Sequence, residues 1–239
     1  MNRKSLLLLT ALLMMLSCTV QSKVENNSLL WSISGNGLKS PSYLFGTHHL
    51  VPITFLDSVP GLKHSFENTE QVVGELDMSN MAEMQMKIMS ESMLPNGVTY
   101  DSLISEEDIE LLDSTLRNLV GVGLEQLGIM KPALLSNLIS LTLYQKFYPT
   151  LSNEISMDQH FQEEALLRNR QVIGLESTED QIEVLLNLQS PERQAEMLMC
   201  MVKNPDLLKE QMDELHVAYH SYDINVLYEL SEKELPNDP

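Results

Sequence analysis

The chain has 239 residues and is strongly acidic, with 34 Asp and Glu against 15 Lys and Arg and a formal net charge of −19. Such a surface repels nucleic-acid phosphates and anionic lipids, which excludes nucleic-acid binding as a function. Only two cysteines are present, Cys18 and Cys200, so no disulfide framework is expected. Cys200 lies in an apolar helical run and is predicted to be a buried core thiol.

Residues 1–18 are typical of a signal peptide. Arg3 and Lys4 precede the apolar run Leu6–Leu16, which is too short to span a bilayer as a helix. The run ends at Met15-Leu16-Ser17-Cys18, which is similar to a lipobox, the motif whose cysteine becomes lipidated. The sequence therefore predicts an exported protein of the cell envelope, in the periplasm or at the cell surface. Lipidation at Cys18 and simple cleavage are the two outcomes that the pattern leaves open.

The next residues, 19–28, are polar and predicted to form a linker between the anchor and the domain. Beyond them, four short apolar runs are bounded by turn residues and predict β-strands. Gly35-Asn36-Gly37 separates the first two runs and favours a hairpin, because these residues tolerate positive φ. The predicted strands are 29–34, 42–47, 71–76 and 171–175.

Most of the remaining chain has apolar residues at three- and four-residue spacing, which predicts helices. The predicted helical segments are 53–68, 80–94, 105–119, 132–147, 155–169, 178–188, 191–203, 205–219 and 222–233. Ser105, Ser190 and Asn204 are the predicted N-caps of three of them. Short strands among many helices predict a mixed α/β (α+β) domain over residues 29–239, with a small central sheet surrounded by helices.

One predicted helix is rich in methionine, with six Met side chains within a few turns. Two interpretations are open: a flexible helix of the core, which is preferred, and an adaptable peptide-binding surface or lid. The six residues are Met78, Met81, Met84, Met86, Met89 and Met93.

Three predicted strands end in residues that can bind a metal or move a proton. His48 and His49 follow the second strand, Glu75 ends the third, and Glu176 follows the fourth. Ligands of open α/β sheets gather beyond the carboxyl ends of strands, and imidazole with carboxylate suits Mn, Zn, Co or Fe. Because neighbouring side chains of an extended backbone point to opposite sides, at most one of the two histidines is expected to face the cluster.

The same residues resemble a known family. Tyr43-Leu44-Phe45-Gly46-Thr47-His48-His49-Leu50 followed by Val72-Val73-Gly74-Glu75-Leu76-Asp77 is similar to the opening of the TraB/GumN family. That family is related to the Tiki metalloproteases and to erythromycin-esterase-like hydrolases. Its signature is Gly-x-x-His at one strand end and a Glu at the next. Met157-Asp158-Gln159-His160 and the segment Gly174 to Gln181 resemble the family's middle stretch.

The resemblance implies a metal-dependent hydrolase that acts on peptide or protein substrates, with Mn or Co as the usual ion. It implies that His49 and Glu75 are catalytic residues and metal ligands. It implies supporting roles for four further residues: Gly46, Glu176, Asp158 and His160.

The sequence departs from the family pattern at its C-terminal end. The family continues with an Arg-Asn pair and a second Gly-x-x-His, whereas this sequence contains no second Gly-x-x-His and ends at Pro239. The domain is therefore expected to be C-terminally incomplete. Two other functions remain open beside the metal-dependent peptidase: a non-catalytic protein that binds a peptide or partner on the same fold, and esterase-like hydrolysis without metal.

His216 and His220 have the four-residue spacing of helical zinc sites. Their acidic surroundings favour the alternative, a solvated helix face. His64 lies in an amphipathic segment and is interpreted as a structural or surface residue.

Overall fold

The computed structural model describes residues 27–149 and 155–232. The predicted signal peptide, Cys18 and most of the predicted linker lie outside these residues. The strands are β1 (Leu30–Ile33), β2 (Ser42–Phe45), β3 (Gln71–Gly74) and β4 (Gln171–Gly174). The helices are α2 (Leu62–Glu67), α3 (Met81–Glu91), α4 (Tyr100–Leu103), α5 (Glu106–Val120), α6 (Leu124–Leu127), α7 (Pro132–Phe147), α8 (Met157–Leu167), α9 (Thr178–Ile182), α10 (Pro191–Lys203), α11 (Pro205–His220) and α12 (Ile224–Ser231). Two 3-10 turns, η1 (Ile53–Ser58) and η2 (Met78–Asn80), and a π-helical segment, η3 (Glu183–Asn187), complete the described elements.

The strands form two separate two-stranded sheets. β1 and β2 are antiparallel, and the predicted turn between them has positive φ at Gly35, Asn36 and Gly37, at 95°, 46° and 83°. β3 and β4 are parallel, with Gly74 opposite Gly174. The predicted mixed α/β class is confirmed and all four predicted strands are present, although they pair two by two instead of joining into one sheet.

Glycine is required at the ends of β3 and β4 because other groups approach their backbones closely. A Cβ on Gly74 would lie 2.6 Å from Nε2 of Gln162, and one on Gly174 would lie 2.6 Å from the backbone nitrogen of Asp77. Helix α8, which contains Gln162, packs on this parallel pair. The glycines therefore let the helix and the chain after β3 lie directly on the sheet.

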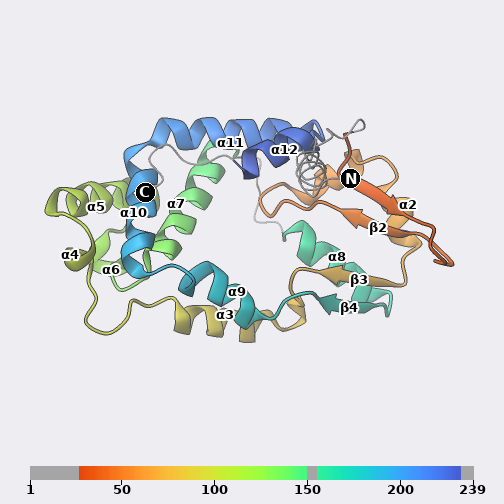
Figure 1. The fold of residues 1–239 in the computed structure, drawn as a ribbon, viewed down its shortest axis with the longest axis horizontal. Helices are drawn as coiled ribbons and strands as arrows, with labels where there is room; N and C mark the ends of the chain where they lie inside the picture. Colours follow the sequence, from red (N-terminus) through yellow and green to blue (C-terminus); the bar gives the residue numbers. More distant parts are fainter. Residues whose placement is uncertain (1–26, 150–154, 233–239) are drawn as a thin grey trace, which may run out of the picture.

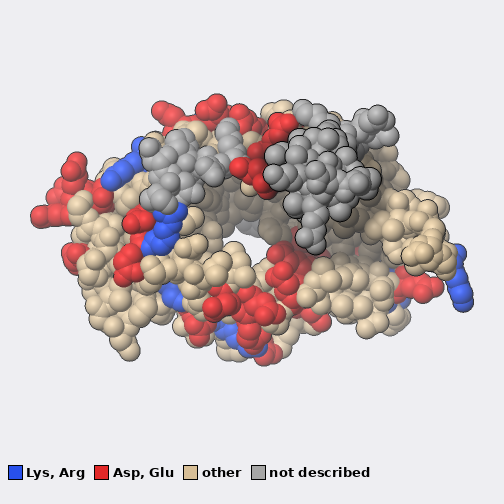
Figure 2. All heavy atoms as spheres, in the orientation of Figure 1, with Lys and Arg blue, Asp and Glu red and all other residues tan. Residues whose placement is uncertain are grey.

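The molecule has a helical end and a strand-containing end (Figure 1), and Asp and Glu predominate over Lys and Arg on the face seen in this orientation (Figure 2). Helices α4, α5, α6, α7 and α10 gather at the helical end, and the strands with α2 and α8 at the other. Helices α11 and α12 connect the two ends along one side, and α3 and α9 along the other. The core of the helical end contains the fully buried Leu112, Leu116, Leu135, Ile139 and Leu198.

A second, smaller core holds the strand-containing end together. Leu29, Val51, Met157 and Tyr219 are buried in it, and Phe45 packs against its edge. These residues come from the hairpin, the segment after it, α8 and the end of α11. The core therefore fixes the turn that contains His48 and His49 between β2 and these two helices.

Two of the three predicted N-caps act as expected. Ser105 and Ser190 each accept a hydrogen bond through Oγ from a backbone N–H of the following turn, at 3.2 and 3.3 Å. Asn204 differs, because its side chain makes no cap bond to α11. Instead its Nδ2 donates to the carbonyl oxygen of Cys200 at 2.7 Å and closes the end of α10.

Two predictions about burial are wrong. The methionine-rich segment is not a core helix: Met84 is buried, but Met86 and Met89 are each 68% exposed and Met93 is 40% exposed. One side of α3 faces solvent there, so burial is limited to the opposite side. Cys200 is only half-buried, because it lies at the border of the packed face of α10. Among the described helices, none combines the length and hydropathy that a bilayer crossing requires.

Candidate active site

The turn after β2 places His49 against Asp158, the second residue of α8. Nδ1 of His49 lies 3.0 Å from Oδ2 of Asp158, and Thr47 donates its hydroxyl to Oδ1 of Asp158 at 2.9 Å. The His49 side chain is 67% exposed and the Asp158 side chain 15%. One carboxylate is thus held by two residues of the strand end, while the far side of the imidazole ring stays open.

The charges of this pair support each other. The hydrogen bond to Asp158 raises the pKa of His49, against the opposing effect of burial, and the nearby Glu75 carboxylate adds to the rise. Burial alone would raise the pKa of Asp158, but the hydrogen bonds from His49 and Thr47 outweigh it and lower that pKa. Asp158 is therefore ionised at neutral pH, and it favours the tautomer of His49 that has its proton on Nδ1.

Glu75 follows β3 and is exposed. Gln181, at the end of the short α9, donates from Nε2 to Oε1 of Glu75 at 2.5 Å. The Glu75 carboxylate acts on the pKa of His49 only through its charge, and this is the smallest of the contributions to that pKa. The two predicted strand ends thus interact electrostatically at His49 and Glu75.

Gln162 fixes the chain after β3. Its Nε2 donates to the carbonyl oxygen of Leu76 at 2.8 Å, and its Oε1 accepts from the backbone N–H of Met78 at 2.8 Å. Gln162 is 3% exposed and lies one helical turn after Asp158 on α8. One face of α8 therefore binds two segments: Asp158 holds the chain after β2, and Gln162 holds the chain after β3.

The other predicted site residues are placed differently. Glu176 is exposed, and its backbone N–H donates to the carbonyl oxygen of Glu75 at 3.0 Å. His160 packs edge-on against Phe161 and lines a different hollow, because it is two residues from Asp158 and so on another face of α8. Gly46 accepts a hydrogen bond from Tyr219, and a Cβ built on it would meet no atom within 4 Å.

His48 points away from this site, as the alternation of the backbone predicts. Its ring lies 5.1 Å from that of Tyr219 and 5.7 Å from that of Tyr144, measured between centroids. Burial, helped by the adjacent His49, lowers the pKa of His48 to about 4. Nδ1 accepts from the backbone N–H of Leu50 at 3.1 Å, which leaves the proton on the buried Nε2. His48 is therefore a neutral core residue.

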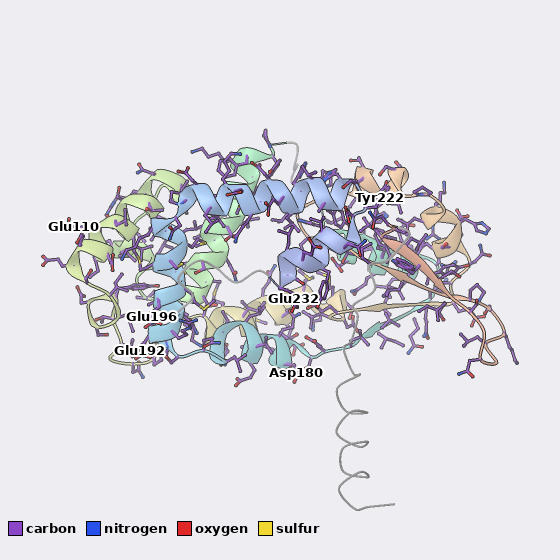
Figure 3. The ribbon with its side chains drawn as sticks, turned by 45° about the horizontal axis from the view of Figure 1, so that its top comes forward. Glu110, Asp180, Glu192, Glu196, Tyr222 and Glu232 are labelled. Atoms are coloured by element: carbon purple, nitrogen blue, oxygen red, sulfur yellow. The ribbon has the colours of Figure 1, made fainter. Side chains whose placement is uncertain are left out.

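The predicted solvated face at His216 and His220 is wrong for His216. Its ring stacks on that of Tyr148, with centroids 4.1 Å apart, and its Nδ1 lies 3.1 Å from the hydroxyl of Tyr144. Burial lowers the pKa of His216. His220 is exposed, but its ring still lies 4.0 Å from that of His216. His216 therefore packs in an aromatic cluster with Tyr144 of α7 and Tyr148 just after it. The cluster lies near the end of α11, and Tyr222 follows that end (Figure 3).

The donor chemistry of His49 and Glu75 suits a divalent transition metal, although these two residues supply fewer ligands than a usual site. A ligating histidine commonly donates its other ring N–H to a carboxylate, which is the arrangement of His49 with Asp158. Within residues 27–149 and 155–232, no group of three or more His, Cys, Asp or Glu is arranged to hold a metal ion.

Comparison with known proteins places the chain in a family. Residues 29–238 match the model of the TraB/PrgY/gumN family, and the chain belongs to it. The Metalloprotease TIKI2 of Danio rerio is 32% identical to this chain over 87 residues, which are 36% of this chain and 17% of that protein. The chain thus matches only a small part of the length of this curated relative. No solved structure matches the chain.

Sequence reasoning missed three residues that build the site. Thr47 and Gln181 stand inside the motifs that suggested the family, and their hydroxyl and amide groups could have been noted as partners for carboxylates. Gln162 is harder to find, because a Gln in an amphipathic helix usually faces solvent. The signal available was its position four residues after Asp158.

Proposed function

We propose that this protein is a metal-dependent hydrolase that cleaves peptide bonds. The observation that supports it best is the hydrogen bond between Nδ1 of His49 and Asp158, at 3.0 Å, together with the effect of the Glu75 charge on the same histidine. With the Nδ1 proton bonded to Asp158, the lone pair of Nε2 lies on the exposed side of the ring. A metal ion binds a neutral histidine through such a lone pair. The membership in the TraB/PrgY/gumN family and the similarity to a metalloprotease agree with this use.

His49 and Glu75 would hold the ion, and Mn or Co fits a mixed imidazole and carboxylate set. Such an ion, when bound, supplies a Lewis acid for the peptide carbonyl and lowers the pKa of a water molecule. The exposed carboxylate of Glu75 is also placed to accept a proton from water, and Gln181 fixes its orientation. Asp158 keeps His49 in one tautomer and one direction.

Metal-induced stabilisation of the full chain tests this proposal first. Mn, Co and Zn are added separately and unfolding is followed by heating, for the wild type, His49→Ala and Glu75→Ala. An ion at a hundred times its Kd stabilises the fold by about 2.7 kcal/mol, and both variants should lose this gain. Glu110→Ala and His64→Ala are matched controls, since both residues are exposed, and Glu110 lies at the helical end (Figure 3).

A peptide-cleavage assay under the same conditions completes the test. Turnover that requires the ion and is lost in Glu75→Ala supports the hydrolase. Turnover that persists after complete removal of metal by chelators would instead indicate esterase-like hydrolysis without metal. Stabilisation by no ion, with no turnover, would contradict the proposal.

A second candidate function is peptide or partner binding without catalysis on the same fold. The limited number of ligands favours it, since the described residues contain no three-ligand group. It predicts that a peptide binds with equal affinity in the presence and absence of metal and is recovered uncut. Cleaved product that depends on Glu75 would rule it out.

We further propose that the protein works in the cell envelope, anchored by a lipid on Cys18. The support is the sequence of residues 1–18 described above. In cells fed a labelled fatty acid, label should enter the wild-type chain and not the Cys18→Ser variant. Label in neither chain, with a new N-terminus after the apolar run, would show simple cleavage.

A further inference from the structure

Among the strands that the structure describes, β2 pairs with β1 alone, so its outer edge is open. The backbone N–H of Gly46 donates to the carbonyl oxygen of Leu29 at 2.9 Å, so Gly46 and Leu29 are a hydrogen-bonded pair of the hairpin. In an antiparallel pair such residues alternate with residues whose N–H and C=O point outward. The register then directs the main-chain groups of Tyr43 and Phe45 away from β1.

The outer edge of β3 is open in the same way. The backbone N–H of Leu175 donates to the carbonyl oxygen of Gly74 at 2.9 Å, which shows that Gly74 bonds toward β4. By the alternation of parallel strands, Val72 also faces β4, while the main-chain groups of Gln71 and Val73 face the other side. Throughout the described ranges, no hydrogen bond occupies these outward groups of Gln71 or Val73. Such an edge is a template for another strand.

A cavity of about 130 Å³ lies between the two open edges. Its lining includes Tyr43 and Phe45 from β2, Gln71 and Val73 from β3, and Leu62 and Phe66 from α2. It is far smaller than the roughly 300 Å³ of a site for a drug-sized molecule. Its size and mostly apolar walls suit one aliphatic or small aromatic side chain.

This cavity borders the candidate active site through one shared residue, Thr47. Thr47 lines the cavity and also donates to Asp158, the partner of His49. Glu75 lies two residues beyond Val73 on the other edge. An extended segment paired with Val73 would therefore pass beside the carboxylates of Asp158 and Glu75. These negative charges favour neutral or basic side chains at that end of the segment.

We propose that the open edges of β2 and β3 bind an extended segment of a peptide substrate by strand addition, with one apolar side chain in the cavity between them. This inference rests on the proposed peptide hydrolase and names the conformation in which its substrate binds. Two features identify the occupant: main-chain groups at the spacing of an extended chain, and the contact of the cavity with the site at His49 through Thr47.

The substitution Val73→Pro tests the proposal, because it removes the outward N–H without touching the bonds to β4. Proline is tolerated at such an edge position. The probes are fluorescein-labelled peptides Lys-Thr-X-Thr-Val-Thr-Lys, in which X is Ala, Val, Leu or Phe. Binding is measured by fluorescence anisotropy to the full chain with Glu75→Gln and a chelator, so that no peptide is cut.

We expect an apolar X larger than Ala to bind more tightly, and Val73→Pro to weaken binding by roughly fivefold, the usual effect of one lost hydrogen bond. Val73→Ala also truncates the side chain that lines the cavity but keeps the N–H, so it should weaken binding less than Val73→Pro does. Binding by none of the peptides, or equal binding by Val73→Pro, would overturn the proposal.

Modified peptides provide an independent test if Val73→Pro lowers the stability of the fold. N-methylation of alternate amides should weaken binding for one set of positions and leave the other set unchanged. Equal effects of both sets would exclude strand addition. If the protein forms a dimer and the Val73→Pro variant is a monomer, the proposal is also overturned, because a second copy of the chain would then occupy the edge of β3.

The outcomes separate this inference from the proposed function. Peptide binding that depends on the Val73 N–H, without metal-dependent turnover in the wild type, would refute the hydrolase and keep strand addition. Turnover that depends on Glu75 but is unchanged by Val73→Pro would refute strand addition and keep the hydrolase.

Discussion

His48 and His49 are neighbours in the sequence but have opposite environments. His48 is packed among the aromatic rings of Tyr144 and Tyr219, and its pKa is lowered to about 4 by burial. His49 is exposed and bonded to Asp158, which raises its pKa. The first is neutral at pH 7, whereas the hydrogen bond to Asp158 stabilises the protonated form of the second.

The difference shows that neighbouring residues of one turn have separate roles: His48 packs the turn against the domain, and His49 faces solvent. The ring of His48 fixes the turn in the core of the strand-containing end, and this anchoring holds His49 at the surface with a defined direction. The residue type alone therefore does not show which histidine could bind a metal. The hydrogen-bond partner of Nδ1 is more informative, because the backbone N–H at Nδ1 of His48 and the carboxylate at Nδ1 of His49 select opposite tautomers.

The largest expected effect comes from removing the charge beside His49. Asp158→Asn keeps the size of the side chain but lowers the basicity of the imidazole, so we expect metal affinity to fall by roughly 10- to 100-fold. Isothermal titration with Mn measures it. Asp101→Asn, at an exposed position of α4, is the control, and unchanged affinity in Asp158→Asn would show that the carboxylate does not act through His49.

The next largest effect concerns the stability that Gln162 gives to the chain after β3. Gln162→Ala removes both hydrogen bonds to the chain after β3 and should lower the free energy of unfolding by about 2 kcal/mol. Urea unfolding measures it, with Gln159→Ala on the same helix expected to cost less than about 0.5 kcal/mol. Equal losses in the two variants would mean that Gln162 has no special role in holding the Glu75 segment.

The neutral state of His48 predicts a dependence of stability on pH. Its pKa is about 4 in the fold, whereas an unperturbed histidine has a pKa of 6.5, so the unfolded chain binds the proton more strongly. Stability is complete above pH 6.5 and falls as the pH decreases toward 4, by at most about 1.4 kcal/mol per pH unit from this residue. The slope of unfolding free energy against pH should be smaller in His48→Phe. An identical slope would show that other groups determine the acid sensitivity.

The smallest expected effect is at the hydroxyl of Tyr144. Tyr144→Phe removes the hydrogen bond to His216 and keeps the ring beside His48, so it should cost about 1 kcal/mol of stability. Thermal unfolding measures this cost, and Mn binding should stay unchanged. A loss of metal binding would mean that the buried cluster and the site at His49 are coupled.

The sequence was sufficient for the elements whose pattern is local. The four strands begin and end within two residues of the predicted limits, and Gly35-Asn36-Gly37 forms the predicted turn. The short helices α4 and α6 were missed because four residues are too few to show a helical period.

Properties that depend on distant parts of the chain could not be predicted in the same way. Periodicity could not show which side of α3 is covered, so exposure of Met86 and Met89 was missed. The pairing of His49 with Asp158 spans 109 positions, and only the family resemblance connected them. The sequence also placed His216 in solvent because its neighbours in sequence are acidic, while its neighbours in space are Tyr144 and Tyr148.

The contacts of α8 have a consequence for the order of folding. Thr47 and His49 meet Asp158 over separations of 111 and 109 positions, and Gln162 meets Met78 over 84. Contacts between such distant residues form late, because the entropy of closing a long loop must be overcome first. During synthesis, His49 and Glu75 therefore emerge well before the helix that orients them. A nascent chain has no assembled centre until α8 docks, so any reactivity of these groups is delayed until the domain has folded.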